Sequence, residues 1–284
     1  MHVGGCTCAA ILPVPELPEV ETIARGLAKR VVGDVIESVW LGSKPEPLKS
    51  PAAEIEAALA SKTILNVRRS GKHIVFDLAD PVRKGMPAAQ WIVHLGMTGR
   101  LLVCSAESEV AKHTHAILRL ASGRELRFVD PRRFGRLAVI EKFAPPGAEP
   151  LSIPLTKFVA LFRGRKTPIK SALLNQKLLS GVGNIYADEG LYRAKVRPRR
   201  RAASLTADEL RLLHKGLKQV LQEAIRLGGS SISDYVDSEG QEGFFQLKHR
   251  VYGREGKPCQ KCGTPIKRVV IAGRSSHYCP TCQK

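Results

Sequence analysis

The sequence contains no run that approaches the roughly 18 consecutive apolar residues of a membrane-spanning helix. Its first 14 residues lack the positively charged n-region of a secretory signal peptide, and their apolar segment is short. Acidic side chains are in the minority, with 26 Asp and Glu against 45 Lys and Arg, a formal net charge of +19. We therefore expect a cytoplasmic protein that has no membrane contact and binds a polyanion.

The basic excess is concentrated in the second half of the chain. Residues 151–284 carry 25 basic and 10 acidic side chains, whereas residues 1–150 carry 20 and 16. A basic surface also aids solubility, but this excess is larger than solubility needs. The distribution predicts that the second half binds nucleic acid, whose phosphates attract Lys and Arg. The 284 residues suffice for two domains, each with its own core.

Four of the seven cysteines stand near the C-terminus in the pattern C-x2-C-x16-C-x2-C. This spacing matches the template of a structural site in which four thiolates bind zinc. Two disulfides are the alternative, but nothing else in the sequence suggests an oxidising compartment. We therefore expect one structural zinc ion, bound by Cys259, Cys262, Cys279 and Cys282.

The first half of the chain alternates short β-type segments with two helical ones. Apolar residues recur at helical spacing from Glu19 to Val31, and a second helix is predicted from Ala52 to Ala60. Seven β-type runs, most of them bounded by turn residues, lie between Val35 and Ile140. This order predicts an N-terminal, mostly antiparallel β-sandwich with flanking helices over residues 15–143.

A proline-rich segment without periodicity, residues 144–150, is the predicted interdomain linker. Residues 151–248 then have helical periodicity, and Thr206 is the predicted cap of the longest helix. The predicted helices are Leu155–Phe162, Ile169–Leu178, Ile185–Ala194 and Asp208–Leu227. Residues 249–284 form the cysteine module, in which the chain between the two cysteine pairs can fold into a zinc-stabilised β-hairpin. The predicted fold class is α+β.

Pro15 opens the run Pro15-Glu16-Leu17-Pro18-Glu19-Val20-Glu21, and Val14 before it is a residue that a GTG start codon would also encode. An α-amine has a pKa near 8, against about 10.4 for lysine, so a terminal proline would be the better nucleophile at neutral pH. We therefore expect residues 1–14 to be an extension that is absent from the mature protein. A retained tail would make the nitrogen an unreactive tertiary amide, and a helix-entry proline is the ordinary structural alternative.

Six motifs occur along the chain in the order Pro15–Glu21, Gly71–His73, His94–Gly99, Asp130–Gly135, Gly181–Tyr186 and the cysteine module. Together, over residues 15–284, they resemble formamidopyrimidine-DNA glycosylase. Endonuclease VIII shares the architecture, but its opening run usually differs at the third position. The resemblance implies a helix-two-turns-helix element in the helical domain. It also implies a bacterial-type, nucleoid-associated enzyme that excises oxidised purines and then cleaves the strand.

The resemblance assigns catalytic roles to four residues. Pro15 attacks C1′ of the damaged nucleotide, expels 8-oxoguanine or a formamidopyrimidine, and holds the sugar as a Schiff base. Glu16 acts as an acid, with Glu19 in support. Lys72 donates a proton in β-elimination, and Arg274 takes part in δ-elimination. The structural alternatives are a helix-dipole partner for Glu16 and solvated side chains for Lys72 and Arg274.

The resemblance also implies two groups of DNA-binding residues. An enzyme that extrudes a base must fill the gap, and Arg132 with Phe134 suits that task because alternate residues point to one side. Met97 would be the third inserted residue, since methionine adapts to irregular gaps. Phosphate contacts are expected from His113, Arg165 and Asn184, and Asn184 is also expected to cap the helix that follows it. Lys170 is expected to contact phosphates for another reason, because it belongs with Arg165 and Lys166 to a basic cluster in the run from Arg163 to Lys170.

The resulting hypothesis is a monomeric, zinc-containing DNA glycosylase with abasic-site lyase activity. Its expected partner is duplex DNA that contains oxidised bases or abasic sites. Two alternatives stay open: an endonuclease VIII-like enzyme for oxidised pyrimidines, and a non-catalytic lesion-binding protein if residues 1–14 are retained.

Overall fold

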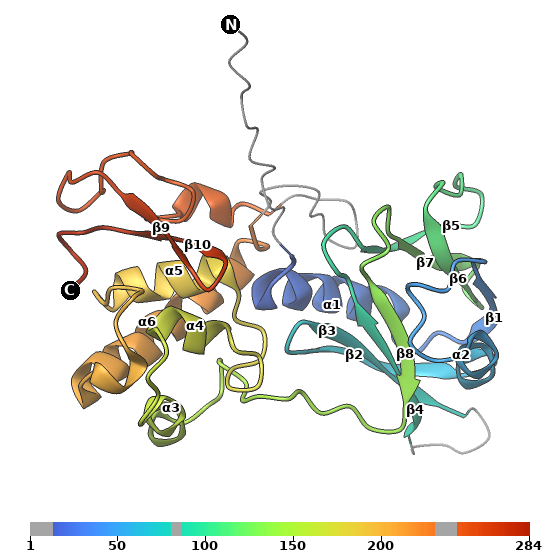
Figure 1. The fold of residues 1–284 in the computed structure, drawn as a ribbon. Helices are drawn as coiled ribbons and strands as arrows, with labels where there is room; N and C mark the ends of the chain where they lie inside the picture. The colour runs from blue at the N-terminus through green and yellow to red at the C-terminus, as the bar shows by residue number, and fades with distance from the viewer. Residues whose placement is uncertain (1–13, 81–86, 231–242) are drawn as a thin grey trace, which may run out of the picture.

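The computed structural model describes residues 14–80, 87–230 and 243–284, and it divides into a β-rich lobe and a helical lobe joined by one extended segment (Figure 1). The predicted N-terminal extension falls almost wholly outside the described residues. The extended segment runs between strand β8, which ends at Ile140, and helix α3, which begins at Leu155. It includes the linker predicted from the proline-rich composition.

The β-rich lobe is a sandwich of two antiparallel four-stranded sheets, as predicted. The first sheet has the order β1 (Ile36–Leu41), β6 (Thr114–Leu120), β7 (Arg124–Val129) and β5 (Arg100–Ser105), and the second has the order β2 (Thr63–Ser70), β3 (His73–Ala79), β4 (Pro87–His94) and β8 (Arg136–Ile140). Strand β5 was not predicted. Helix α2 (Ala52–Leu59) packs against the sandwich through Ile55 and Leu59.

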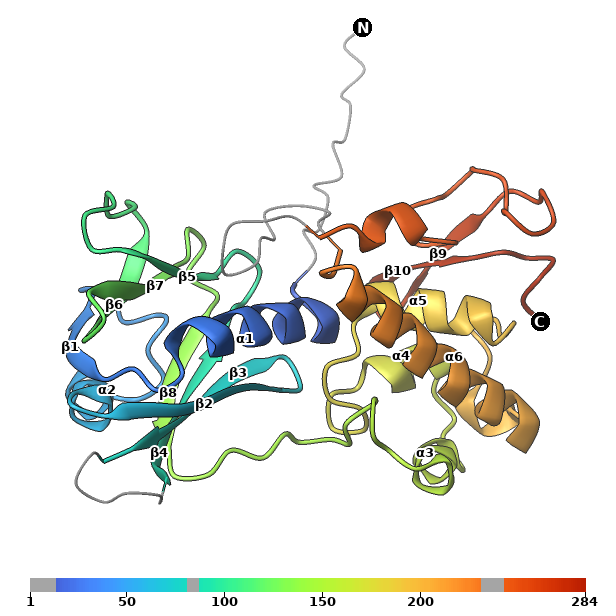
Figure 2. The same ribbon diagram turned by 180° about the vertical axis from the view of Figure 1, so that it is seen from behind.

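Helix α1 (Leu17–Val31) lies between the two lobes (Figure 2). It begins two residues earlier than predicted, because Glu16 and Glu19 form a capping box at its first turn. Its apolar stripe belongs to two cores: Leu17 packs with the helical lobe, and Val20 and the following buried residues pack with the sandwich. The start of α1 is therefore fixed by both lobes.

Among the described residues, the helices of the second lobe pack around one apolar core. Its elements are α3 (Leu155–Phe162), α4 (Ile169–Leu174), α5 (Asn184–Arg193), α6 (Ala207–Arg226) and the short 3₁₀ helices η1 (Ala202–Ser204) and η2 (Phe245–Lys248). Thr206 caps α6 and accepts the backbone N–H of Glu209, as predicted. Helix α4 is shorter than predicted: its C-cap Asn175 is extended, and the side chain of Asn175 accepts the N–H of Lys177 in a turn.

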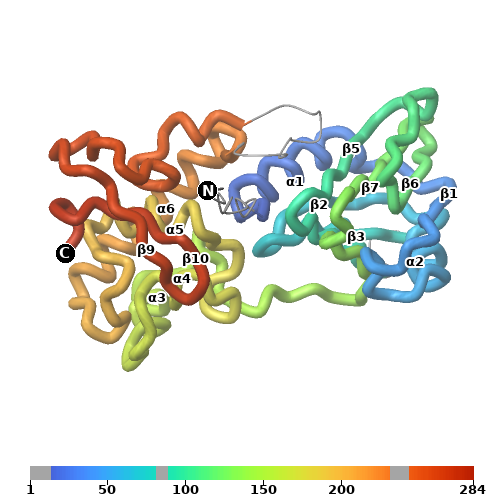
Figure 3. Tube along the Cα trace, turned by 45° about the horizontal axis from the view of Figure 1, so that its top comes forward, coloured from blue at the N-terminus to red at the C-terminus, as the bar shows by residue number. Residues whose placement is uncertain are grey.

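The cysteine module contains the predicted hairpin, formed by β9 (Lys267–Ile271) and β10 (Arg274–Tyr278) between the two cysteine pairs. Its two-residue turn has positive φ at both positions, 47° at Ala272 and 73° at Gly273. That geometry fits the right-handed twist of the flanking strands. The hairpin tip points toward the connection between α4 and α5 (Figure 3). Within the described ranges, no helix is both long and apolar enough to cross a membrane.

Candidate active site

A cavity of about 450 Å³ lies where the start of α1, the β2–β3 turn, the α4–α5 connection and the hairpin tip meet. Every one of these elements contributes polar side chains to its wall. The wall includes Glu16, Lys72, His94, Asn175, Gln176, Asn184, Tyr252 and Arg274. Three of the four predicted catalytic residues therefore share one cavity, although they are far apart in the sequence.

Pro15, the fourth, is buried immediately before Glu16. In the 284-residue chain its nitrogen is joined to the carbonyl of Val14, and Val14 itself lies in the cavity wall. A proline nitrogen in a peptide bond has no free lone pair for attack. Only a chain that begins at Pro15 would present this nitrogen as an amine beside the cavity.

Glu16 is tied to the opposite lobe through its carboxylate. Its side chain accepts the backbone N–H of Ile185 at 3.0 Å and of Tyr186 at 3.4 Å, in the first turn of α5. Burial raises the pKa of Glu16 to about 7, and nearby Lys72 and the two N–H groups oppose this rise. A carboxyl group with this pKa is partly protonated at neutral pH and can act as an acid.

Glu19 supports Glu16 from one helical turn away. It accepts the backbone N–H of Glu16 at 2.9 Å, the hydroxyl of Tyr186, and the N–H of Ser230 at 2.8 Å. Burial raises the pKa of Glu19, while these three donors oppose the rise. Glu19 thus orients Glu16 and joins three chain segments beneath the cavity.

Lys72 and Arg274 face the cavity from the two lobes. Lys72 is half-buried in the β2–β3 turn, where Gly71 has a φ of 60°. Burial lowers the pKa of Lys72 and the charge of Arg274 adds to this, while Glu16 and Glu19 oppose it. A lysine with a lowered pKa is better suited to proton transfer at neutral pH. Arg274 is exposed at the tip of the zinc hairpin, where a phosphate could approach it.

Asn184 lies in the cavity wall but does not cap α5. The N-cap is Gly183, and Asn184 is the first helical residue. The carboxylate of Glu16 caps the helix instead, because it accepts the backbone N–H groups of Ile185 and Tyr186. Tyr252 lines the same cavity, and Oδ1 of Asn184 is buried without a hydrogen-bond partner among the described residues.

Two ring-bearing side chains of the cavity wall, His94 and Tyr252, were given no role by the sequence analysis. Nδ1 of His94 accepts the N–H of Gly96 at 3.1 Å, and burial lowers the pKa of His94 to about 3. The ring is therefore neutral and carries its proton on Nε2, as a hydrogen-bond donor. The motif His94–Gly99 was the available signal, whereas nothing in the sequence around Tyr252 pointed to the cavity.

The three residues expected to fill a gap in the duplex lie on two neighbouring loops of the β-rich lobe. The guanidinium of Arg132 is 4.9 Å from the ring centre of Phe134, so the two side chains do share a side, and Phe134 is 52% exposed. Met97 is half-buried. Asp130 fixes the loops by accepting the hydroxyl of Thr98 and, at 2.7 Å, the N–H of Gly135. An exposed aromatic ring on a loop that is fixed in this way is suited to contact a ligand rather than to fill the core.

The expected phosphate contacts differ in exposure. His113 is exposed beside the same loops, and its carbonyl accepts the N–H of Asp130. Arg165 is exposed in the loop before α4. Lys170 departs from the expectation, because it is fully buried and paired with Asp188. The basic run from Arg163 to Lys170 suggested a solvent-facing surface, but Lys170 is in the first turn of α4, on the side that faces α5.

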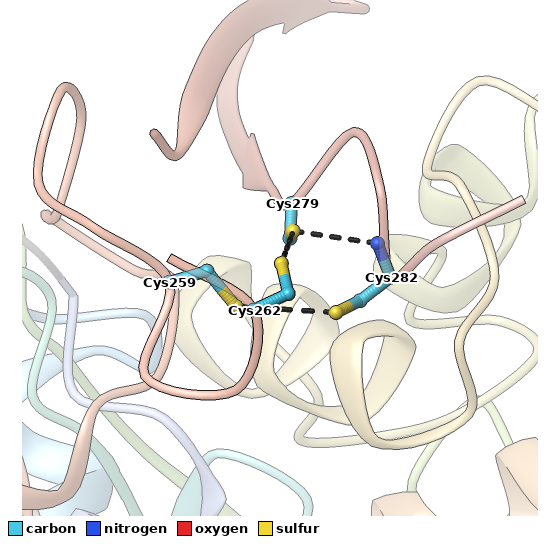
Figure 4. A group of neighbouring side chains, drawn as sticks. All are labelled: Cys259, Cys262, Cys279 and Cys282. Carbon is cyan, nitrogen blue, oxygen red and sulfur yellow. Dashed lines mark hydrogen bonds between the residues drawn. The ribbon is translucent and has the colours of Figure 1, made fainter. Parts of the chain in front are cut away.

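The four cysteines of the C-terminal module converge, with all sulfur atoms within 4.8 Å of one another (Figure 4). The Sγ–Sγ separations are 4.0 Å for Cys259–Cys282 and 3.5 Å for Cys262–Cys279. Disulfides require about 2.05 Å, whereas tetrahedral zinc with Zn–S bonds of about 2.3 Å places the sulfurs roughly 3.8 Å apart. The donor set thus fits one zinc ion, and all four thiols are free.

The chain matches three family descriptions in succession: the formamidopyrimidine-DNA glycosylase N-terminal domain over residues 14–137, the H2TH domain of the same enzyme over residues 147–236, and a zinc finger found in FPG and IleRS over residues 256–284. Formamidopyrimidine-DNA glycosylase of Desulforamulus reducens is 42% identical over 95% of this chain and 99% of its own. The Solibacter usitatus enzyme is 44% identical over 95% and 100%.

Solved structures give the same result. MutM (FPG) from Thermus thermophilus is 43% identical, with a TM-score of 0.82 over 95% of this chain and 98% of that one. A Lactococcus lactis FPG mutant bound to DNA containing Fapy-dG is 34% identical, with a TM-score of 0.85 over 95% and 100%. Fold and site together define the class, a DNA glycosylase with an H2TH domain and a zinc finger. The chain belongs to the formamidopyrimidine-DNA glycosylase family.

Proposed function

We propose that this protein is a base-excision repair glycosylase and abasic-site lyase that removes oxidised purines from duplex DNA. One observation carries the proposal: Glu16, Lys72 and Arg274 converge on a single cavity, directly beside Pro15. An amine nucleophile, an acid with a pKa of about 7, a lysine with a lowered pKa and a phosphate-binding cation make up a complete set for this chemistry.

In the first step, the free amine of Pro15 forms a bond to C1′ of the damaged nucleotide. The glycosidic bond to the base breaks, and Glu16 donates a proton that assists base loss or sugar-ring opening. The C1′–O4′ bond of the sugar then breaks, O4′ takes up a proton and the amine proton is lost, which leaves an iminium between Pro15 and C1′ of the opened sugar. The support for Pro15 as the terminal residue is that the family match begins at residue 14. In addition, the relatives match over 99–100% of their own length but only 95% of this chain.

In the second step, the iminium acidifies the C2′ proton, and its loss breaks the C3′–O bond by β-elimination. Lys72 donates a proton to the leaving group. Arg274 binds the neighbouring phosphate and assists the subsequent δ-elimination. Zinc would supply no chemistry to these steps; bound to the four cysteines, it would hold the hairpin that carries Arg274.

The same proposal covers recognition. Arg132, Phe134 and Met97 fill the space left by the extruded nucleotide, while His113, Arg165 and Asn184 contact phosphates. The role of Arg132 and Phe134 is supported by the stacking of the guanidinium on the aromatic ring and by the exposure of Phe134. We propose further that the protein acts as a monomer in the cytoplasm. The net charge of +19 favours association with DNA there.

Borohydride trapping tests the proposal directly, because it reduces an iminium to a stable covalent adduct. Two forms are compared on a duplex that contains 8-oxoguanine: the full chain and a chain that begins at Pro15, with each amino terminus confirmed by intact mass. We expect an adduct from the second form alone. An adduct from a form whose Pro15 is still acylated would contradict the mechanism, and no adduct from either form would favour the non-catalytic lesion binder.

Substrate class is tested with the same form on duplexes that carry 8-oxoguanine or thymine glycol. We expect faster cleavage of the 8-oxoguanine duplex. A clear preference for thymine glycol would instead assign the endonuclease VIII-like specificity.

A further inference from the structure

A buried ion pair behind the cavity connects three elements. Lys170 of α4 and Asp188 of α5 are both fully buried, and Nζ of Lys170 lies 2.7 Å from Oδ1 of Asp188. Neither residue belongs to the cavity wall. Removing two charges from water is energetically unfavourable, and well-packed apolar side chains often stabilise a protein equally well. Stability alone therefore gives little reason for this pair.

The pair binds the strand that carries Arg274. Nζ of Lys170 donates to the carbonyl oxygen of Ser275 at 2.7 Å. Oδ2 of Asp188 accepts the backbone N–H of His277 at 2.8 Å. Residues 275 and 277 are alternate positions of β10, so their backbone groups point to the same edge of the strand. Strand β10 belongs to a two-stranded sheet and pairs with β9 along its other edge. The ion pair thus occupies the place of a neighbouring strand on the free edge of β10.

The same helix also holds Glu16. The first turn of α5 donates its N–H groups to Glu16, and Asp188 follows about one turn later. Helix α5 therefore spans from the carboxylate of Glu16 to the strand of Arg274. A shift of β10 relative to α5 would change the distance between Arg274 and the rest of the cavity wall.

We propose that Lys170 and Asp188 are positioning residues that set the reach of Arg274 into the cavity. This inference rests on the proposed function of the site. It predicts that losing the pair matters only as long as Arg274 is present. A purely structural role would instead slow the enzyme equally with and without Arg274.

The test is a double-mutant cycle between K170M/D188L and R274A. The apolar double variant removes both charges together, so that neither is left buried and unpaired. All variants begin at Pro15 and keep every described helix and strand. The rate of strand cleavage is measured in single turnover on an abasic-site duplex, with zinc content and melting temperature recorded for each variant.

We expect K170M/D188L to slow cleavage by about 10- to 100-fold, since a displacement of about 1 Å can have that effect. In the R274A background the same change should have less than about a twofold effect. Equal slowing in both backgrounds would overturn the inference. So would an R274A variant that cleaves as fast as the unaltered enzyme, although borohydride trapping at Pro15 would then still support the proposed function.

A matched control uses another buried ion pair, Arg127 with Glu125, which lies on β7 of the sandwich at 2.7 Å. The variant R127M/E125L removes comparable buried charges without touching β10. Any effect it has should be the same with Arg274 present or absent. If the control also loses its effect in the R274A background, the cycle reports general instability, and the assignment to Lys170 and Asp188 fails.

Discussion

Replacing Glu16 by glutamine should change how the stability of the protein depends on pH. The carboxyl group of Glu16 is buried between the two lobes, and its pKa is raised from 4.5 to about 7. Burial is the main cause, because a charged carboxylate is poorly solvated there. Glutamine has nearly the same shape and can still accept an N–H from α5, but it does not titrate.

Proton linkage gives the sign and the size of the change in the free energy of unfolding. The folded protein holds the proton of Glu16 more tightly than the unfolded chain. This contribution to stability is therefore fully present below about pH 4.5 and is lost as the pH rises through about 7. The interval between the two pKa values corresponds to about 3 kcal/mol, at about 1.36 kcal/mol per pKa unit. The free energy of unfolding of E16Q should gain about this amount, relative to wild type, between pH 4.5 and 8.

The assay is urea unfolding of the full 284-residue chain and of E16Q across this pH range, with the difference taken at each pH so that shared groups cancel. Glu209 provides a control of opposite sign, because hydrogen bonds from Arg200 lower its pKa. The contribution of Glu209 is present above about pH 4.5 and is lost as the pH falls. A difference between wild type and E16Q that stays constant from pH 4.5 to 8 would refute our account of Glu16.

Two further substitutions test the site. In Gly183→Ala the new Cβ would lie 2.1 Å from Cδ of Glu16, so Glu16 must move, and base release should fall about 100-fold in a single-turnover assay. Gly42→Ala, whose Cβ meets its neighbours at an ordinary 3.5 Å, is the control, and equal rates for both would contradict the crowding argument. Cys279→Ser should release zinc and weaken DNA binding, as measured by metal analysis and a duplex-binding titration, whereas Cys104→Ser should keep the metal. Unchanged zinc content in Cys279→Ser would disprove the four-thiolate site.

Features that depend on residues close together in the chain could be predicted from the sequence alone. The apolar period of α1 predicted a helix, Thr206 predicted the start of α6, and the cysteine spacing predicted the zinc hairpin. Each of these signals spans a few residues or one local motif, so the physics that produces it is visible in the order of side chains. Strand β5 is an exception, because its apolar run is short and lacks clear alternation.

Only the tertiary structure decided how the predicted site residues act together. Glu16 caps α5 across the lobe boundary, so Asn184 is not needed as the cap. Lys170 stands in a basic run, yet Asp188 and Ser275 take it out of solvent. The pKa of Glu16 likewise depends on what packs over it. Burial, pairing and pKa depend on segments that are distant in the chain, and the local order of residues does not specify them.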